Sequence, residues 1–266
     1  MRITPRLIIA AALAAGTTLN AGSAPAGRAK EIVDRAVAAL GGSNFLQLKS
    51  VTSSGRGYGF FRGELKGLDL QKSMLEYLAD NSKGLHVRQR VWIGKKQDYS
   101  LLYTPNAAYE VTFRGVRPFP DEQWEKYERS TRNNILYVLR TRLNEPGLQF
   151  DYAGSEVFIS RHVEIIEITD STDQVIRVYF DHNSGLPLHE TYQWFDPAMK
   201  VRNDEAIDFD KYRDAGGGIM WPYSVERESN GYKVSQFFAD KVEVNQSVPA
   251  DTFDLPTGSK MLKKTD

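Results

Sequence analysis

The 266-residue chain contains no cysteine. It therefore has no disulfide, no thiolate metal ligand and no cysteine nucleophile, and no lipid can be attached to an N-terminal cysteine. Its 34 basic residues balance its 34 acidic residues, so no overall field attracts nucleic acid or an acidic membrane surface. A chain of this length can bury a sizeable core without covalent cross-links.

Catalytic and metal-binding motifs are also missing. The chain has no Gly-x-Ser-x-Gly nucleophile elbow. Its four histidines stand singly on polar strand faces or turns and form no His-x-His or His-x-x-x-His pair: His86, His162, His182 and His189. Asp208 and Asp210 could act as a carboxylate pair or hold calcium. Their alternation with Ile207 and Phe209 instead favours a solvated strand face, so the sequence predicts a protein that is not an enzyme and needs no cofactor or metal.

The N-terminal residues have the pattern of a targeting segment. Arg2 and Arg6 precede the apolar run Leu7–Leu19, and small residues follow as far as Ala26. This order is typical of a signal peptide that is cleaved during export, here residues 1–26 with the cleavage site open. The run is shorter than the roughly 20 residues that span a bilayer, although an uncleaved anchor is the alternative. Export of a chain without cysteine predicts a periplasmic protein.

Two segments have helical periodicity. Between Ala29 and Leu40, apolar residues recur at the spacing of one helix face, and Gly41-Gly42 ends the pattern. The second predicted helix runs from Asp121 to Leu143 and carries a stripe of aromatic and aliphatic residues. Such a stripe usually packs on a core, and the alternative is that this helix serves as a movable lid over a sheet.

The rest of the chain has the alternation of β-strands. In the clearest hairpin, Val175–Phe195, two apolar strands flank the turn residues Asp181–Gly185, and Glu190 interrupts the apolar face without an evident reason. The strand Val51–Phe61 carries three glycines on one face. The first helix could pack closely there, or the glycines could leave room for a ligand.

These patterns predict a mainly β (α+β) fold in one domain, residues 27–258, followed by a polar tail, residues 259–266. About ten strands joined by short turns make a mostly antiparallel sheet, which has to curl into an incomplete barrel. The two helices are expected on its concave side.

A curved sheet that only two helices cover can leave an apolar cavity, which is the usual form of a small-molecule or lipid site. The candidate cavity residues are bulky apolar residues, most of them on the predicted core-side faces: Val91, Ile93, Tyr109, Trp124, Val178, Tyr192, Trp194, Trp221, Tyr223 and Phe238.

The order of the elements resembles a known family, the LolA-like outer-membrane lipoprotein-sorting proteins. The resemblance covers Ala29 to Pro256 and depends on four short motifs: Leu40-Gly41-Gly42, Ser184-Gly185-Leu186-Pro187, Gly218-Ile219-Met220-Trp221-Pro222 and Phe253-Asp254-Leu255-Pro256. It implies an incomplete β-barrel with a helical lid and an apolar cavity, without a cofactor. The family's cavity-gating arginine has two candidates by region, Arg56 and Arg88.

The resemblance implies a periplasmic carrier for the acyl chains of lipoproteins or lipids. It extends to mycobacterial lipid-binding lipoproteins and to a periplasmic regulator of a sigma-factor pathway. The alternative is therefore a signalling or scaffold module that senses envelope lipids or mislocalised lipoproteins through transient protein partners. A hydrolase that uses Asp208 and Asp210 is the third hypothesis. We expect a monomer that binds lipid or acyl chains and no nucleic acid.

Overall fold

The computed structural model describes residues 25–79 and 84–264, and the predicted signal peptide lies almost entirely outside them. Their thirteen strands form one antiparallel sheet. The strands are β1 (Ser50–Phe61), β2 (Glu64–Tyr77), β3 (Val87–Ile93), β4 (Tyr99–Tyr103), β5 (Ala108–Thr112), β6 (Gly115–Pro118), β7 (Gln149–Phe158), β8 (Arg161–Thr169), β9 (Val175–Asp181), β10 (Pro187–Asp196), β11 (Val201–Asp214), β12 (Met220–Ser229) and β13 (Tyr232–Val244). The helical segments are α1 (Pro25–Leu40), α2 (Ser43–Leu46), α3 (Asp121–Asn133), α4 (Ile135–Tyr137) and the π-helical turn η1 (Val138–Arg142).

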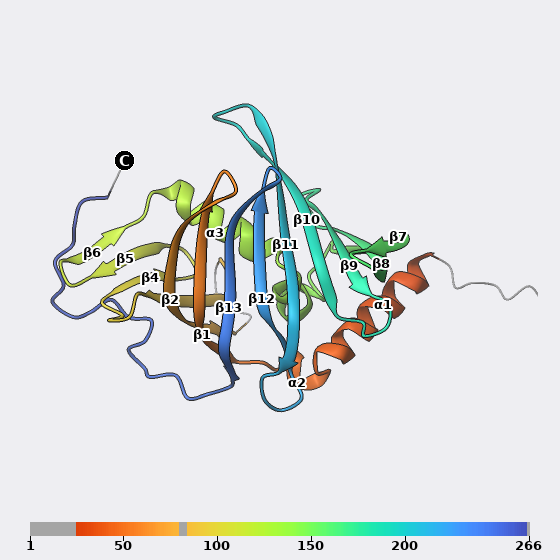
Figure 1. The fold of residues 1–266 in the computed structure, drawn as a ribbon, viewed down its shortest axis with the longest axis horizontal. Helices are drawn as coiled ribbons and strands as arrows, with labels where there is room; N and C mark the ends of the chain where they lie inside the picture. Colours follow the sequence, from red (N-terminus) through yellow and green to blue (C-terminus); the bar gives the residue numbers. More distant parts are fainter. Residues whose placement is uncertain (1–24, 80–83, 265–266) are drawn as a thin grey trace, which may run out of the picture.

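The sheet is open, with β6 at one edge and β7 at the other. Its order is β6-β5-β4-β3-β2-β1-β13-β12-β11-β10-β9-β8-β7, so the first and last strands of the chain pair in its middle. Figure 1 shows β1, β2 and β10 to β13 side by side, while β4 to β6 and β7 to β9 turn away behind them on either side. The prediction of a mainly β, antiparallel fold is confirmed.

The predicted count of about ten strands is too low. One of the additional strands is β6, which has only four residues and ends in Pro118. This proline is tolerated because β6 is an edge strand, where a missing amide hydrogen breaks no ladder hydrogen bond. Among the described residues, no helix combines the length and the hydropathy needed to cross a membrane.

The main core lies between α1, α4 with η1, and the inner face of the sheet. The predicted apolar stripe of α1 is buried throughout and meets β-strand side chains such as Ile166, Val178 and Phe209 in one cluster. Helix α1 packs chiefly against β7 and β12, so the expected packing on the glycine face of β1 is wrong. Gly41 ends α1 with φ 124°, and a Cβ there would lie 2.9 Å from the carbonyl oxygen of Gly218.

Two β-bulges reverse predicted strand faces. In β13 the register with β1 skips Asp240, so Val242 and Val244 face the core while Phe238 lies on the outer face near Lys211. In β10 the register skips Leu188, which joins a separate outer cluster. An extra residue in one strand of a pair shifts the alternation by one position, which explains why the predicted core-facing position of Phe238 is wrong.

The predicted helix Asp121–Leu143 is broken at Asn134. This residue has extended backbone angles, φ −66° and ψ 125°, and its side-chain oxygen accepts hydrogen bonds from the amides of Leu136 and Tyr137. Asparagine is a strong N-cap and a weak helix former. The segment is therefore two units, α3 before the break and the α4–η1 segment after it.

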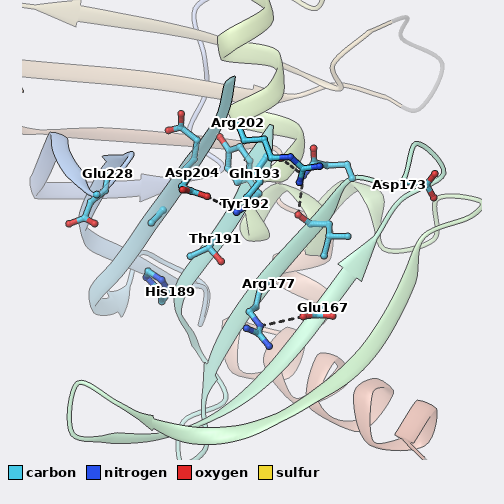
Figure 2. A pocket seen from close by; sticks show the side chains of 15 residues that line it. Glu167, Asp173, Arg177, His189, Thr191, Tyr192, Gln193, Arg202, Asp204 and Glu228 are labelled. Carbon is cyan, nitrogen blue, oxygen red and sulfur yellow. Dashed lines mark hydrogen bonds and ion pairs between the residues drawn. The ribbon is translucent and has the colours of Figure 1, made fainter. Parts of the chain in front are cut away.

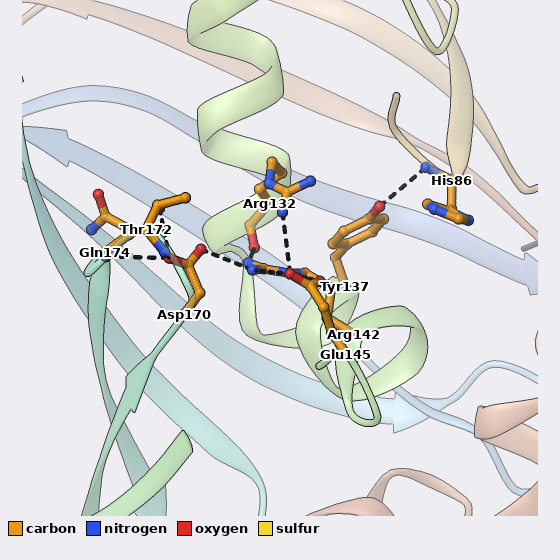
Figure 3. Close-up of polar contacts among 8 residues, drawn as sticks. All are labelled: His86, Arg132, Tyr137, Arg142, Glu145, Asp170, Thr172 and Gln174. Atoms are coloured by element: carbon orange, nitrogen blue, oxygen red, sulfur yellow. Dashed lines mark hydrogen bonds and ion pairs between the residues drawn. The ribbon is translucent and has the colours of Figure 1, made fainter. Parts of the chain in front are cut away.

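Polar contacts fix the α4–η1 segment to the rest of the molecule (Figure 3). The buried guanidinium of Arg142 donates to the carboxylates of Glu145 (2.6 Å) and Asp170 (2.9 Å). Burial alone would raise the pKa of Asp170, but hydrogen bonds from Thr172 and Arg142 outweigh it and hold this pKa at about 2. The Tyr137 hydroxyl accepts from the His86 amide at 3.1 Å.

We expect Asp170→Asn to lower the free energy of unfolding by about 3 kcal/mol near neutral pH, because it leaves a buried guanidinium with one carboxylate fewer. The lowered pKa of Asp170 means that its charge stabilises the fold above about pH 4 and that this contribution is lost as the pH falls towards about 2. The difference between parent and variant should shrink over that range.

Urea unfolding across this pH series measures the effect. Asp173→Asn is the matched control, because Asp173 lies exposed in the same turn and its positive φ suits asparagine. An equal loss of stability in both variants would contradict the role assigned to Asp170.

Candidate functional site

A cleft of about 1020 Å³ lies between the concave face of the sheet and α3, and we call it the inner cleft. Its sheet side is formed by inward-facing residues of the central strands, and its helical side by α3 and the start of α4. Apolar side chains such as Val91, Trp221 and Phe237 alternate with polar ones such as Gln71 and Gln89. The wall therefore suits a ligand that has both an apolar and a polar part.

The glycines of β1 contribute to the shape of the inner cleft. A Cβ at Gly57 would lie 2.0 Å from the side-chain amide nitrogen of Gln71, so Gln71 lies where a side chain at position 57 would stand. At Gly55, the backbone of the bulged strand β13 fills the corresponding space, with the Phe238 carbonyl oxygen 2.0 Å from a built Cβ. The glycine run thus admits close neighbours, and only part of it faces the cleft.

Helix α3 covers the inner cleft but buries little of itself. Its only buried residue is Asn133, at its C-terminal end. Tyr127 stacks on Tyr103 of β4 with ring centroids 3.9 Å apart, and burial raises the pKa of Tyr103 to about 12. On the other side, the Arg129 guanidinium lies 3.6 Å from the ring centroid of Trp194 in β10. The helix is held by a few contacts to strands on both sides of the cleft.

Arg227 joins the sheet directly to α3. Its guanidinium donates a hydrogen bond to the Ser130 hydroxyl at 2.7 Å, and both residues line the inner cleft. Neither arginine expected from the resemblance has this position. Arg56 pairs with Asp240 on the exposed outer face, and Arg88 pairs with Glu76 and lies over the Phe253 ring.

Glu190 holds the break between α3 and α4, which explains its place in an otherwise apolar strand face. It is fully buried, and its carboxylate accepts a hydrogen bond from the Ile135 amide at 2.7 Å. Its other carboxyl oxygen has no partner among the described residues. Burial raises the pKa of Glu190 to about 8, against the opposing effects of the Ile135 amide and Arg227. The neutral acid is thus the favoured form at neutral pH.

The structure separates the ten predicted cavity residues. Val91 and Trp221 line the inner cleft. Trp124 and Trp194 lie beside it, since Trp124 packs against Tyr127 and Trp194 meets Arg129. The other six occupy different places: Val178 and Tyr223 belong to or pack on the main core, Tyr109 packs on a second core cluster, Tyr192 is buried on β10, Ile93 lies at the end of β3, and Phe238 faces outward.

A second hollow of about 870 Å³ lies over β8 to β12, and we call it the outer groove (Figure 2). Charged and amide side chains line it, and they largely satisfy one another: Glu167 pairs with Arg177 at 3.4 Å, and Gln193 donates to Asp204 at 2.6 Å. No group of three or more carboxylates and histidines among the described residues is arranged to hold a metal ion. We therefore take the inner cleft as the candidate site.

The acidic pair considered as catalytic lies on the outer side of the sheet. Asp208 is 2.7 Å from the Nδ1 atom of His189, whose ring packs against Phe158 and Tyr179.

Sequence reasoning missed Arg227, Ser130 and Gln71 as cleft residues. Their signal was a polar residue on a strand or helix face that otherwise reads as core.

The fold has counterparts among solved structures. A domain of a candidate outer membrane lipoprotein-sorting protein from Vibrio parahaemolyticus matches with a TM-score of 0.56 at 12% identity, over 86% of this chain and 97% of that one. The predicted likeness to outer-membrane lipoprotein-sorting proteins is confirmed at the level of the fold. A DUF1329 family protein from Desulfovibrio piger matches with a TM-score of 0.59, with the same identity and coverage. No family model and no curated protein matches the sequence.

We expect Glu190→Gln to make stability less dependent on pH. The pKa of Glu190 is higher in the folded than in the unfolded protein, so its protonation stabilises the fold below about pH 4 and this contribution is lost as the pH rises towards 8. The parent should lose up to about 1.4 kcal/mol per pH unit relative to the variant over this range. Urea unfolding of both proteins at several pH values measures the difference, and parallel curves would contradict it.

We expect Arg227→Ala to loosen α3 and leave the α4–η1 segment in place. Losing a charged hydrogen bond to Ser130 should raise amide exchange in α3 about tenfold. Exchange in the α4–η1 segment, which Arg142 and Tyr137 anchor, should stay unchanged. Hydrogen–deuterium exchange resolves the two segments. Arg213→Ala is the control, since Arg213 of β11 lies over the ring of Tyr223 and not against α3. Equal exchange of α3 in both variants would contradict this role.

Proposed function

We propose that the protein is a periplasmic carrier that binds the acyl chains of lipoproteins or lipids in the inner cleft. The observation that carries the proposal is the cleft of about 1020 Å³ beneath α3, on the concave face of an open sheet. Its volume is that of a site for a sizeable small molecule. The fold likeness to a lipoprotein-sorting domain supports the same function.

The lining divides the cleft into parts that suit the two ends of a lipid. Aliphatic and aromatic side chains such as Val51, Leu75 and Val225 offer apolar contact to a hydrocarbon chain. Lys126 and Arg227 bring positive charge to the side of the cleft at α3. An acyl chain would lie against the sheet, and an anionic or polar head group would lie near these two residues.

The attachment of α3 suits a carrier, because cargo has to enter and leave. Its contacts with β4, β10 and β12 are a ring stack, a cation–π contact and one hydrogen bond, whereas the α4–η1 segment contributes aliphatic side chains to the main core. Movement of α3 about Asn134 would open the cleft without disturbing the main core. In this proposal α3 is the lid.

Filling the inner cleft should abolish binding. Val91→Trp places a large ring in the cleft, and we expect the affinity for a fluorescent fatty acid to fall about tenfold or more, since the site loses apolar contact area. Val157→Trp is the matched control, because Val157 is exposed on β7. Titration of both variants, with circular dichroism to verify the fold, measures the effect. A parent protein that carries no lipid by mass spectrometry and takes up no fatty acid would overturn the proposal.

A further inference from the structure

Three neighbouring hairpin turns form one end of the central sheet, and we call them the hairpin edge. They are residues 61–66 between β1 and β2, 195–202 between β10 and β11, and 229–234 between β12 and β13. Pairing brings them together, because Gly59 of β1 lies opposite Ser235 of β13 and Ser229 of β12 lies opposite Glu205 of β11. Figure 1 shows the three turns at the same end of the sheet, with the β10–β11 turn reaching furthest out.

Large apolar side chains stand exposed on this edge. Met199 is 71% exposed, Phe61 61% and Phe195 59%. Seven of the sixteen exposed large hydrophobic residues among the described part of the chain lie in these short turns: Phe61, Leu65, Phe195, Met199, Val201, Tyr232 and Val234. Single exposed apolar residues are ordinary, but a group of them marks a surface that meets another apolar phase.

The same turns are basic, although the chain as a whole has no net charge. Five basic residues against two acidic ones, Glu64 and Asp196, give the hairpin edge a net charge of +3: Arg62, Lys66, Lys200, Arg202 and Lys233. Cations also lie beside aromatic rings, since the Arg62 guanidinium is 5.4 Å from the Phe61 ring centroid and the Lys233 ammonium is 5.4 Å from that of Phe60.

A fourth turn repeats the combination. Phe113, between β5 and β6, is 81% exposed, and the guanidinium of its neighbour Arg114 lies 5.4 Å from its ring centroid. Successive strands from β1 to β6 are antiparallel neighbours. The β5–β6 turn therefore joins the same ends of its strands as the β1–β2 turn does. The pairing of an exposed aromatic with an arginine thus recurs in a turn outside the hairpin edge, which Figure 1 shows at the left of the molecule.

We propose that the hairpin edge docks reversibly onto an anionic lipid surface. Apolar tips can enter the boundary between head groups and acyl chains, while lysine and arginine remain at the head groups and are attracted to anionic lipid. Only a few side chains would insert, so attachment would be transient. This inference concerns the outside of the protein and does not depend on what the inner cleft binds.

Co-sedimentation with vesicles tests the proposal. The purified protein is mixed with vesicles of phosphatidylcholine alone or of an equal mixture of phosphatidylcholine and phosphatidylglycerol. We expect binding to the mixed vesicles only, weakened by added salt because the attraction is screened. Lys200→Gln combined with Arg202→Gln should lower the affinity about thirtyfold, and Phe61→Ser combined with Met199→Ser roughly tenfold.

The control is Val157→Ser combined with Ile159→Ser. These two residues are as exposed as Phe61 and Met199, and they lie at the β7–β8 turn, which joins the opposite ends of the strands. All variants keep the same N-terminal residues, so a difference in vesicle binding between variants reports the substituted residues of the hairpin edge. Fatty-acid binding should be unchanged in every edge variant, which separates this proposal from that for the inner cleft.

Equal binding to both kinds of vesicle, or binding that survives the edge substitutions, would overturn the proposal. So would failure to bind vesicles together with saturable, edge-dependent binding to an acidic protein, which would assign the edge to a protein partner.

Discussion

The segment between β6 and β7 has to cross the whole concave face, because those two strands are the opposite edges of one open sheet. Helices α3, α4 and η1 are this crossing. A crossing that is buried throughout would fill the concave face. Here only its second half is buried, and its first half lies over a space that it does not fill. Chain connectivity therefore places a crossing segment over the concave face, and the inner cleft lies under the half of it that is not buried.

The two halves of the crossing differ in how they are held. The α4–η1 segment contributes aliphatic side chains to the main core and is fixed by the buried contacts of Arg142 and Tyr137. Helix α3 relies on ring stacking and on two arginine contacts, Arg129 with Trp194 and Arg227 with Ser130. Asn134 and the buried acid Glu190 mark the boundary. A helix anchored at one end by the core and at the other by replaceable contacts is suited to uncover what lies beneath it.

Periodicity and turn chemistry were sufficient to predict the class of fold. The stripe of α1, the turn residues Asp181–Gly185 and the alternation of most strands act locally, so they can be read from neighbouring residues. The bulges at Asp240 and Leu188 could not be read in this way, because each depends on the register of a partner strand. Such a bulge turned Phe238 outward. Four other predicted cavity residues are buried or packed on a core cluster: Val178, Tyr109, Tyr192 and Tyr223. Periodicity identifies an inner face but does not tell whether the space in front of it is filled.

The candidate site was harder to predict than the fold because its polar residues depend on distant partners. Glu190 is explained only by the Ile135 amide, 55 residues away, and Arg227 only by Ser130, 97 residues away. In sequence each is a single polar residue on an apolar strand face, and nothing near it in the chain explains it. Their burial or their place in a cleft follows from the path of the crossing segment, which no local pattern specifies.

The pairing of β1 with β13 has a consequence for how the protein reaches this structure. Val51 lies opposite Val244, about 190 residues later in the chain. The seam in the middle of the sheet therefore forms only when nearly all of the polypeptide is available, and until then β1 and β12 each present an unpaired edge. Long-range pairing of this kind carries a large loop-closure cost and places a domain among the slower folders. Acquisition of the native state thus depends on the last strand, and truncation before it would leave two half-sheets without a common centre.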